Sequence, residues 1–353
     1  MDKAHIARYK PYYCELEEGK AYFWCSCGRS SKQPFCDGSH KGSNFLPIKY
    51  IAKDADEEVL FCGCKQTRDQ PFCDGTHNNL LDTYALEELD NESAKLTNMI
   101  TRNATNPIAT LNNKCYVSNP ADHELSTTGS LAWCVLISEQ MGAQYQSQYY
   151  LQQAVGTSPI VSFGDSEIAM LVRAGKGEIV ISGQAFQLSK HAGIYVKAGE
   201  AFCLITTSDK PLEIYATICP EGNGLKTLSA MPDNFDLTAV NRVVSIDEAN
   251  AQSMGDRFFQ ILVGKEVGSK VLTEFIGDIP QSKAAMHRHL YEETLVILEG
   301  EGVMCTEDWK TKVVSGDIMF LPRKQIHSLE CTSEKGMRLA GVIYPGDNPS
   351  INY

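Results

Sequence analysis

A repeated set of cysteines and histidines constrains this chain more than any other feature of its sequence. The polar stretch FWCSCGRSSKQPFCDGSH contains Cys25, Cys27, Cys36 and His40. The stretch LFCGCKQTRDQPFCDGTH repeats the same intervals at Cys62, Cys64, Cys73 and His77. A Cys-x-Cys pair brings two thiolates onto one metal ion, and the third cysteine with the histidine four positions later can bind a second ion. Each stretch is therefore predicted to fold as a short loop around metal.

The metal is not fixed by the residue types alone. Three thiolates and one imidazole suit either zinc or an iron–sulfur cluster. Zinc sites usually combine two Cys-x2-Cys units, a spacing that neither loop has. In each loop a Cys-Asp-Gly turn precedes the histidine, because Asp caps a turn and Gly accepts a positive φ. A helical turn carrying the histidine is then expected to start at Ser39 and at Thr76.

Both loops resemble the CDGSH iron–sulfur family. The stretches CSCGRSSKQPFCDGSH and CGCKQTRDQPFCDGTH match the signature of that family at every position. The resemblance implies a 2Fe–2S cluster in each loop, so two clusters in a tandem, NEET-type module. It implies that the Cys-x-Cys pair binds one iron of each cluster, and that the third cysteine and the histidine bind the other. A histidine ligand raises a cluster's potential above that of all-cysteine ferredoxins. The sequence is compatible with either electron transfer or redox sensing as the role of the clusters.

The chain from Leu131 onward has a different sequence pattern. Short apolar runs of β type alternate with Gly and Asp turns, as in an antiparallel barrel or sandwich. IAMLVRAGKGEI and TLVILEGEGVMC are each a strand, a Gly-x-Gly turn and a second strand. HAGIYVKAGEAF and VSGDIMFLPRKQIH follow them in the same order. This internal repeat predicts two copies of one β-fold.

The second copy contains a candidate metal site. His287 and His289 are two residues apart, so both imidazoles point to the same face of a strand. Glu293 follows four residues later, and GDIMFLPRKQIH ends in His327. Three histidines and a carboxylate suit one divalent metal ion, for which Fe(II) is favoured and Mn, Ni, Co, Cu or Zn stay open.

These residues resemble the cupin superfamily. His287, His289 and Glu293 fit its first motif, and His327 fits its second. The family implies a jelly-roll barrel with the metal at its mouth. The chain departs from the motifs where Gln281 replaces the leading glycine, Lys324 an inner glycine, and Glu330–Cys331 the closing Asn. These positions are structural, so the ligand assignment is retained.

The first copy lacks these ligands. Aligned on the Gly-x-Gly turns, Ser162 and Gly164 stand in place of the paired histidines. Ile168 replaces the glutamate and Phe202 the last histidine. The sequence therefore predicts one barrel without metal and one with it.

The predicted fold class is mainly β, with a small β-rich tandem CDGSH module followed by two jelly-roll cupin barrels. The expected boundaries are 1–81 for the iron–sulfur module, 82–128 for a connector, 129–225 for the first barrel and 226–353 for the second. A helix with an apolar face from Leu86 to Ile100 is expected within the connector.

Charge and composition exclude some classes of function. The net charge is −12 with no basic stripe, which disfavours nucleic acid and anionic membranes as partners. No apolar run has the roughly 18 residues of a membrane span. The N-terminal residues contain no apolar signal core, so a cytoplasmic location is expected, with reduced cysteines outside the two loops.

These features together predict an enzyme, a metal-dependent cupin oxidoreductase, in particular a non-haem oxygenase or dioxygenase of a small organic substrate. The clusters would supply electrons or redox control, with an electron-donor reductase and a homodimer through the barrels as expected partners. A non-redox cupin enzyme of the aminohydrolase or isomerase type, and a redox sensor or cluster-transfer protein, are the alternatives. The weaker candidates for lining the substrate pocket are Thr273, Phe275, Arg323, Arg338 and Tyr344.

Overall fold

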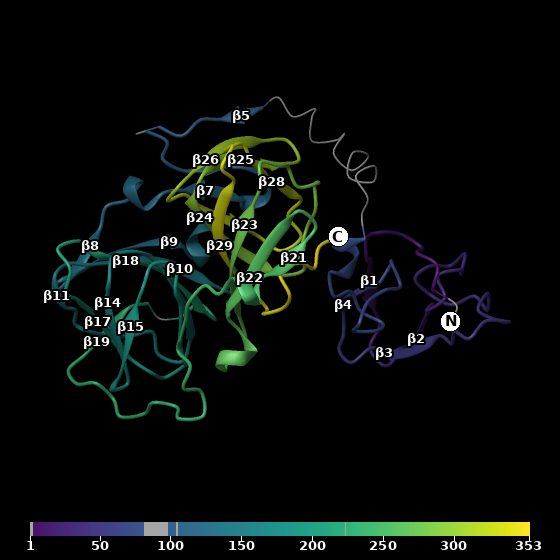
Figure 1. Cartoon of the computed structure of the whole chain (residues 1–353), viewed down its shortest axis with the longest axis horizontal. Helices are drawn as coiled ribbons and strands as arrows, with labels where there is room; N and C mark the ends of the chain where they lie inside the picture. Colours follow the sequence, from purple (N-terminus) through teal and green to yellow (C-terminus); the bar gives the residue numbers. More distant parts are fainter. Residues whose placement is uncertain (1–2, 81–97, 104, 223) are drawn as a thin grey trace.

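The computed structural model describes residues 3–80, 98–103, 105–222 and 224–353. In Figure 1 a small N-terminal module lies beside two larger β-sheet units, and the C-terminus ends next to that module. The module contains two antiparallel pairs of strands. They are β1 (Tyr12–Leu16) with β4 (Glu57–Phe61), and β2 (Ala21–Trp24) with β3 (Ile48–Ile51).

The module's core is aromatic. Trp24 and Phe61 are fully buried, and Phe72 stacks on Phe61 with ring centroids 5.9 Å apart. Phe35 meets the edge of Phe61 at 5.7 Å. Because these rings stand directly beside the loop cysteines in sequence, the core holds both Cys–His loops in place.

The first barrel consists of two facing sheets. One has the strand order β20-β16-β13-β18-β10-β9-β8, and the other β15-β14-β17-β12-β19 with β11 on β17. The strands are β8 (Ser126–Thr128), β9 (Leu131–Ile137), β10 (Ser147–Gln153), β11 (Gly156–Thr157), β12 (Ile160–Ser162), β13 (Glu167–Ala174), β14 (Gly177–Ile181), β15 (Gln184–Leu188), β16 (Gly193–Val196), β17 (Phe202–Thr206), β18 (Leu212–Cys219), β19 (Lys226–Leu228) and β20 (Val243–Val244).

The second barrel repeats this plan with the sheets β21-β22-β23-β29-β24-β27-β7-β6 and β28-β25-β26-β5. Its strands are β5 (Met99–Ile100), β6 (Ala109–Thr110), β7 (Tyr116–Ser118), β21 (Gln252–Met254), β22 (Arg257–Val263), β23 (Thr273–Ile279), β24 (Glu292–Glu299), β25 (Glu301–Thr306), β26 (Lys310–Val314), β27 (Ile318–Leu321), β28 (His327–Cys331) and β29 (Met337–Tyr344). The predicted mainly β fold with two copies of one unit is confirmed.

The described helices are single 3-10 turns. They are η1 (Thr76–Asn79), η3 (Asn112–Lys114), η4 (Pro120–Asp122), η5 (Glu139–Met141), η6 (Glu248–Asn250) and η7 (Lys265–Val267). None of the helices in the described ranges has the length and apolarity that a bilayer crossing requires.

The predicted connector differs from the structure. Most of the expected helix falls within residues 81–97, outside the described residues. Met99 and Ile100, assigned to its apolar face, instead form β5, which pairs in parallel with β26. β7 joins the second barrel through β27, and β8 joins the first through β9. Short parts of the segment from residue 99 to 128 are therefore sheet, because edges of both barrels accept its strands.

The internal repeat is also visible in the contacts between the two barrels. Glu167 at the start of β13 accepts hydrogen bonds from Ser269 Oγ at 2.9 Å and from Lys270 N. Glu292, at the matching start of β24, accepts from the backbone N–H of three successive residues at 2.8–3.3 Å. These are Gln144, Tyr145 and Gln146. Each barrel thus inserts one buried carboxylate into a loop of the other.

We expect Glu292→Ala to weaken this junction. Glu292 is 1% exposed, so its loss leaves backbone donors buried without an acceptor, which costs about 1–3 kcal/mol of unfolding free energy. Denaturant unfolding followed by near-UV circular dichroism measures the change. Glu299→Ala on the same strand is the matched control, because Glu299 forms an exposed pair with Lys190 and such pairs contribute little. Equal unfolding midpoints for the two variants would contradict the role of Glu292.

Candidate metal centres

The first Cys–His loop begins where β2 ends. Cys25 N donates to Pro34 O at 2.8 Å, and Cys36 N donates to Phe23 O at 2.8 Å, so the loop is closed by backbone bonds. The Sγ atoms of Cys25 and Cys27 lie 3.6 Å apart. Cys36 Sγ lies 3.1 Å from His40 Nδ1. The structure therefore brings together the side chains of each pair that the sequence predicts as ligands.

The second loop repeats this geometry after β4. Cys62 N donates to Pro71 O at 2.9 Å, and Cys73 N donates to Leu60 O at 2.8 Å. The Sγ atoms of Cys62 and Cys64 are 3.5 Å apart, and Cys73 Sγ is 3.4 Å from His77 Nδ1. His77 sits in η1, the helical turn expected at Thr76. It is 2% exposed, so this site is more deeply buried than the partly exposed first one.

The surroundings of the sulfur atoms fit thiolates. Backbone N–H groups point at three of them: Arg29 N at Cys27, Gly38 N at Cys36 and Lys65 N at Cys62, at 3.2–3.5 Å. The hydrogen bond from the Cys64 thiol lowers the pKa of Cys62 to about 6, whereas the same hydrogen bond raises the pKa of Cys64 and burial raises that of Cys73 to about 12. Such donors favour the ionised sulfur that soft metals and iron–sulfur clusters require. Both loops therefore fit a cluster with three cysteines and one histidine.

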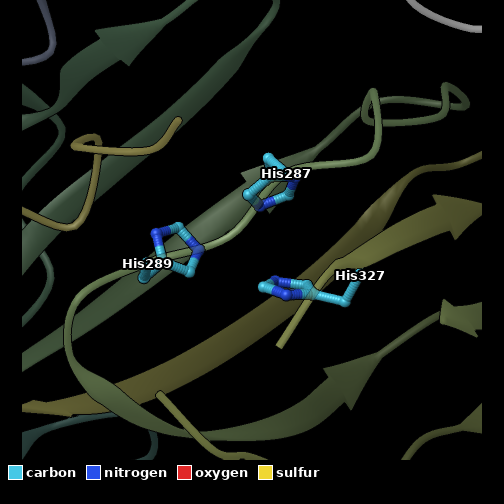
Figure 2. Close-up of side chains that lie close together, drawn as sticks. All are labelled: His287, His289 and His327. Carbon is cyan, nitrogen blue, oxygen red and sulfur yellow. The ribbon is translucent and has the colours of Figure 1, made fainter. Parts of the chain in front are cut away.

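The second centre lies in the second barrel. His287 pairs by a bridge of backbone bonds with His327, the first residue of β28, and His289 precedes β24. One ring nitrogen from each histidine lies within 4.8 Å of the other two. Figure 2 shows the three imidazoles facing one another from two neighbouring segments. Three of the four predicted ligands thus converge.

Backbone carbonyls orient these histidines. His287 Nδ1 donates to Ala285 O at 2.7 Å, and His289 Nδ1 donates to Ile351 O at 3.0 Å. His327 Nδ1 donates to Gln325 O at 2.9 Å. A carbonyl only accepts, so each Nδ1 carries the proton and each Nε2 keeps its lone pair for a metal. Burial lowers the pKa of His289 to about 3 and of His327 to about 4, which keeps both neutral and able to bind a metal ion.

Glu293 lies beside the histidine triad on β24. Its Oε2 is 3.8 Å from His289 Nε2, and the residue is 5% exposed. Burial raises the pKa of its carboxyl to about 8. Without a cation this buried carboxyl keeps its proton near neutral pH, and a divalent metal at the triad would stabilise its charged form. The donor set of the predicted site, three imidazoles and one carboxylate, therefore fits a divalent metal.

A cavity of about 90 Å³ opens at the triad. Its walls are mainly apolar and include Phe259, Phe275 and Leu339, with Arg257 as the cation. A second cavity of about 430 Å³ lies between the barrel and the N-terminal module. The two cavities share the wall residues Met254, Arg257, His287 and Asn352, and the larger one also includes His77. The buried Cys–His site and the triad thus border the same space.

A salt bridge pair fixes the module on the barrel. Arg323 Nη2 lies 2.9 Å from Glu58 Oε2, and Lys324 Nζ binds the other oxygen of Glu58. Lys324 has φ +65, the left-handed backbone that explains why the cupin motif has a glycine there. The lysine at this position therefore supplies a docking contact that a glycine would lack.

Of the weaker pocket candidates, only Phe275 lines the triad cavity. Arg323 contacts Glu58, Arg338 pairs with Asp278 at 2.7 Å, and Tyr344 stacks on Tyr145. Thr273 lines a separate cavity. Arg257 and Asn352 also line the triad cavity and are not among the residues predicted from the sequence. Arg257 is the first residue of a strand and Asn352 lies near the chain end, so neither stands in a pattern that marks it.

The first barrel has apolar side chains where the second has ligands. Ile168 and Phe202 are 1% and 0% exposed and belong to its core. Ser162 Oγ accepts from Gly164 N at 3.1 Å. Among the described residues, the triad of the second barrel is the one group of three histidine, cysteine or acidic side chains whose ligand atoms all lie within 4.8 Å of one another.

Two family models match separate parts of the chain. Residues 7–41 match the family described as iron-binding zinc finger CDGSH type, and residues 278–343 match the cupin domain. The chain carries an N-terminal CDGSH-type domain and a C-terminal cupin domain. These matches contain the first Cys–His loop and the histidine triad. The second loop lies outside them, so the tandem arrangement rests on its sequence and geometry.

The CDGSH part is similar to the human mitochondrial CDGSH iron-sulfur domain-containing protein 3, with 49% identity over 51 residues. This covers 14% of the chain and 40% of the relative. The chain therefore spans about two fifths of the length of this curated relative.

The two-barrel part is similar to solved cupin structures of low identity. Protein Ylba from E. coli has a TM-score of 0.52 at 14% identity, over 68% of this chain and 95% of that one. An oxalate decarboxylase formate complex from Lactobacillus farciminis has 0.53 at 10%, over 65% and 86%. A salicylate 1,2-dioxygenase from Pseudaminobacter salicylatoxidans has 0.50 at 12%, over 60% and 75%. These likenesses show the shared fold and confirm the jelly-roll prediction.

Proposed function

We propose that this protein is a metal-dependent cupin oxidoreductase, specifically an oxygenase of a small organic acid, with two 2Fe–2S clusters that supply electrons or redox control. The observation that carries the proposal is the cavity of about 430 Å³, which both His77 and His287 line and which shares wall residues with the triad cavity. A cluster site and a mononuclear site placed this way fit joint redox chemistry. Two solved proteins of the same fold are named as an oxalate decarboxylase and a dioxygenase, which supports an enzyme.

The ligand sets follow from the geometry already described. The four ligands of each Cys–His loop would hold one cluster, and the histidine triad with Glu293 would hold one divalent ion, Fe(II) by preference. When bound, the clusters supply one-electron chemistry, and the divalent ion supplies a Lewis-acid and redox centre.

The chain's own residues would select the substrate. Arg257 is 12% exposed at its side chain, and its nearest carboxylate, Asp256, is 3.8 Å away and 57% exposed. Its Nη2 donates to Leu329 O at 3.3 Å. A guanidinium buried in an apolar cavity with such weak pairing favours an anionic group, and it binds carboxylates well because its donors form a fork. The phenyl rings of Phe259 and Phe275 would pack on the substrate and exclude water.

A non-redox cupin reaction is the alternative, and the likeness to an oxalate decarboxylase favours keeping it. An aminohydrolase or isomerase would use the same metal and cavity but consume no oxygen. A redox sensor or cluster-transfer protein would show no turnover at all. The proposed partners are an electron-donor reductase and a second copy of this chain, bound through the barrels.

Oxygen uptake tests the proposal. Ferrous-loaded protein with intact clusters is expected to consume oxygen with at least one member of a panel of small carboxylates. Arg257→Leu should raise KM for that acid by about 10–100-fold, since a charged hydrogen-bonded contact contributes about 1.5–3 kcal/mol. Arg338→Leu is the matched control, because Arg338 pairs with Asp278 away from the cavity. Product formation without oxygen uptake would favour the non-redox enzyme, and equal KM values would remove Arg257 from substrate recognition.

A further inference from the structure

The last six residues connect the two kinds of centre. In Figure 1 the C-terminus lies between the second barrel and the N-terminal module. Residues 348–353, the C-terminal tail, contact both. Ile351 packs in one apolar cluster with Leu60 and Cys73 of the module. The tail is thus part of the wall that separates the second Cys–His loop from the histidine triad.

Adjacent tail residues each meet a candidate ligand of a different centre. Ile351 O accepts from Nδ1 of His289 at 3.0 Å, which leaves Nε2 of that ring for the metal. Asn352 Oδ1 lies 3.4 Å from Nε2 of His77, whose Nδ1 faces Cys73. An amide oxygen only accepts, so this contact fixes the proton of His77 on Nε2 and leaves Nδ1 for a cluster.

The tail is held firmly against the second loop. Asn78 Nδ2 donates to Ser350 O at 2.7 Å, and Asn348 Nδ2 donates to Asp74 O at 3.3 Å. Gly75 has φ +83, and a Cβ there would lie 2.0 Å from Ser350 Oγ. The loop therefore needs glycine both for its turn and for the close approach of the tail.

The tail is also anchored on the barrel side. Arg288 and Tyr353 exchange two backbone hydrogen bonds at 3.1 Å, and the Tyr353 ring stacks on Tyr13 of the module with centroids 5.5 Å apart. A shift of His289 on binding a metal would thus be transmitted to Asn352 through a segment that has contacts on both sides.

The first Cys–His loop has a different environment. His5 N donates to Cys27 O at 3.0 Å, so this loop lies against the N-terminal segment. His40 is partly exposed, whereas His77 is 2% exposed. The two sites have the same ligands but different outer contacts, so they need not behave alike.

We propose that Asn352 is a positioning residue for His77, and that the tail couples the second Cys–His site to the triad while the first site stays independent. This deepens the proposed function and rests on its assignment of a cluster and a metal to these residues. An acceptor on the outer nitrogen of a ligand imidazole makes the ring a stronger donor, and such partners change metal affinity by about 10–100-fold. The coupling is reciprocal, because it is a free energy shared by both sites.

The experiment measures the reduction potential of each cluster in the full chain. An EPR-monitored redox titration is made with the triad metal bound and after its removal by a chelator, and the Cys36→Ser and Cys73→Ser variants identify which signal belongs to which cluster. In the wild type, the second cluster is expected to shift when the triad metal is removed, and the first is expected to stay constant.

Asn352→Leu should raise the potential of the second cluster, because His77 becomes a weaker donor, and should abolish its response to the triad metal. Asn352→Asp keeps an acceptor and should restore the response. Deleting residues 351–353 removes the Ile351 carbonyl and should weaken Mn²⁺ binding at the triad by about 10–100-fold. Binding of Mn²⁺ alone is followed by loss of the free-ion EPR signal while the clusters are oxidised.

The outcomes separate the two proposals. If both centres are present but Asn352→Leu leaves the second potential unchanged, or both clusters shift equally, the positioning role and the coupling are overturned while the proposed function stands. If the wild type holds no cluster in the second loop or no metal at the triad, the proposed function fails and the coupling fails with it.

Discussion

Replacing Cys36 or Cys73 by serine is expected to remove one cluster and leave the other. The wild type should contain about four cluster irons and matching sulfide per chain, because each Cys–His loop provides one complete ligand set. Each variant should contain about two. The third cysteine faces the histidine in both loops, at 3.1 Å in the first and 3.4 Å in the second, so its loss opens one iron to solvent.

Iron and sulfide analysis with visible absorption spectra measures this loss. Cys203→Ser is the matched control, since Cys203 lies in the first barrel and takes no part in either loop. It should keep all four irons. The second loop lies outside the residues that match the family model, so the Cys73→Ser result decides whether the module is a tandem. A colourless, zinc-containing wild type after anaerobic preparation would contradict both cluster assignments.

The loop geometry could be predicted from the sequence because it is local. The ligands of each loop lie within a short stretch, and the Cys-Asp-Gly turn closes it locally through the positive φ of Gly38 and Gly75 and through Asp37 and Asp74, whose carboxylates accept from nearby backbone N–H groups. The same backbone bonds then form in both copies. The two barrels repeat one plan because the same order of apolar runs and Gly-x-Gly turns occurs twice in the sequence.

Contacts between distant parts of the chain could not be predicted in this way. His77 and Asn352 are 275 positions apart, and no spacing rule connects them. Met99 and Ile100 have apolar spacing that fits a helix, yet they add a parallel strand to β26 because the barrel edge offers unpaired backbone groups. Arg257 became a candidate only when the fold placed it on the triad cavity.

The loss of the motif glycine at position 324 leaves the triad in place. Lys324 takes the left-handed backbone that the cupin motif assigns to glycine, and its N–H donates to His289 O at 2.8 Å. The backbone bond that supports the histidine is therefore kept, and the side chain is free to bind Glu58. The cost of a non-glycine residue at positive φ, about 1 kcal/mol, is offset by a contact that joins the module to the barrel.

His327→Ala is expected to abolish metal binding at the triad and to leave both clusters intact. His327 supplies one of only three convergent imidazoles among the described residues, so its removal should cost more than the about 10–100-fold that outer contacts contribute. Metal analysis should find about one non-cluster metal ion per chain in the wild type and close to none in the variant. The visible spectrum of the clusters should be unchanged, because effects at separate sites usually add.

Ser162→Ala is the matched control for this loss. Ser162 occupies the position in the first barrel that corresponds to a ligand histidine, but its hydroxyl accepts from Gly164 N at 3.1 Å and donates to Glu200 O at 3.4 Å. Its replacement should leave the metal content unchanged. Glu293→Gln should weaken binding without abolishing it, because the triad remains while the buried negative charge beside it is lost. A full complement of non-cluster metal in His327→Ala would place the ion elsewhere and remove the triad as the centre of the proposed reaction.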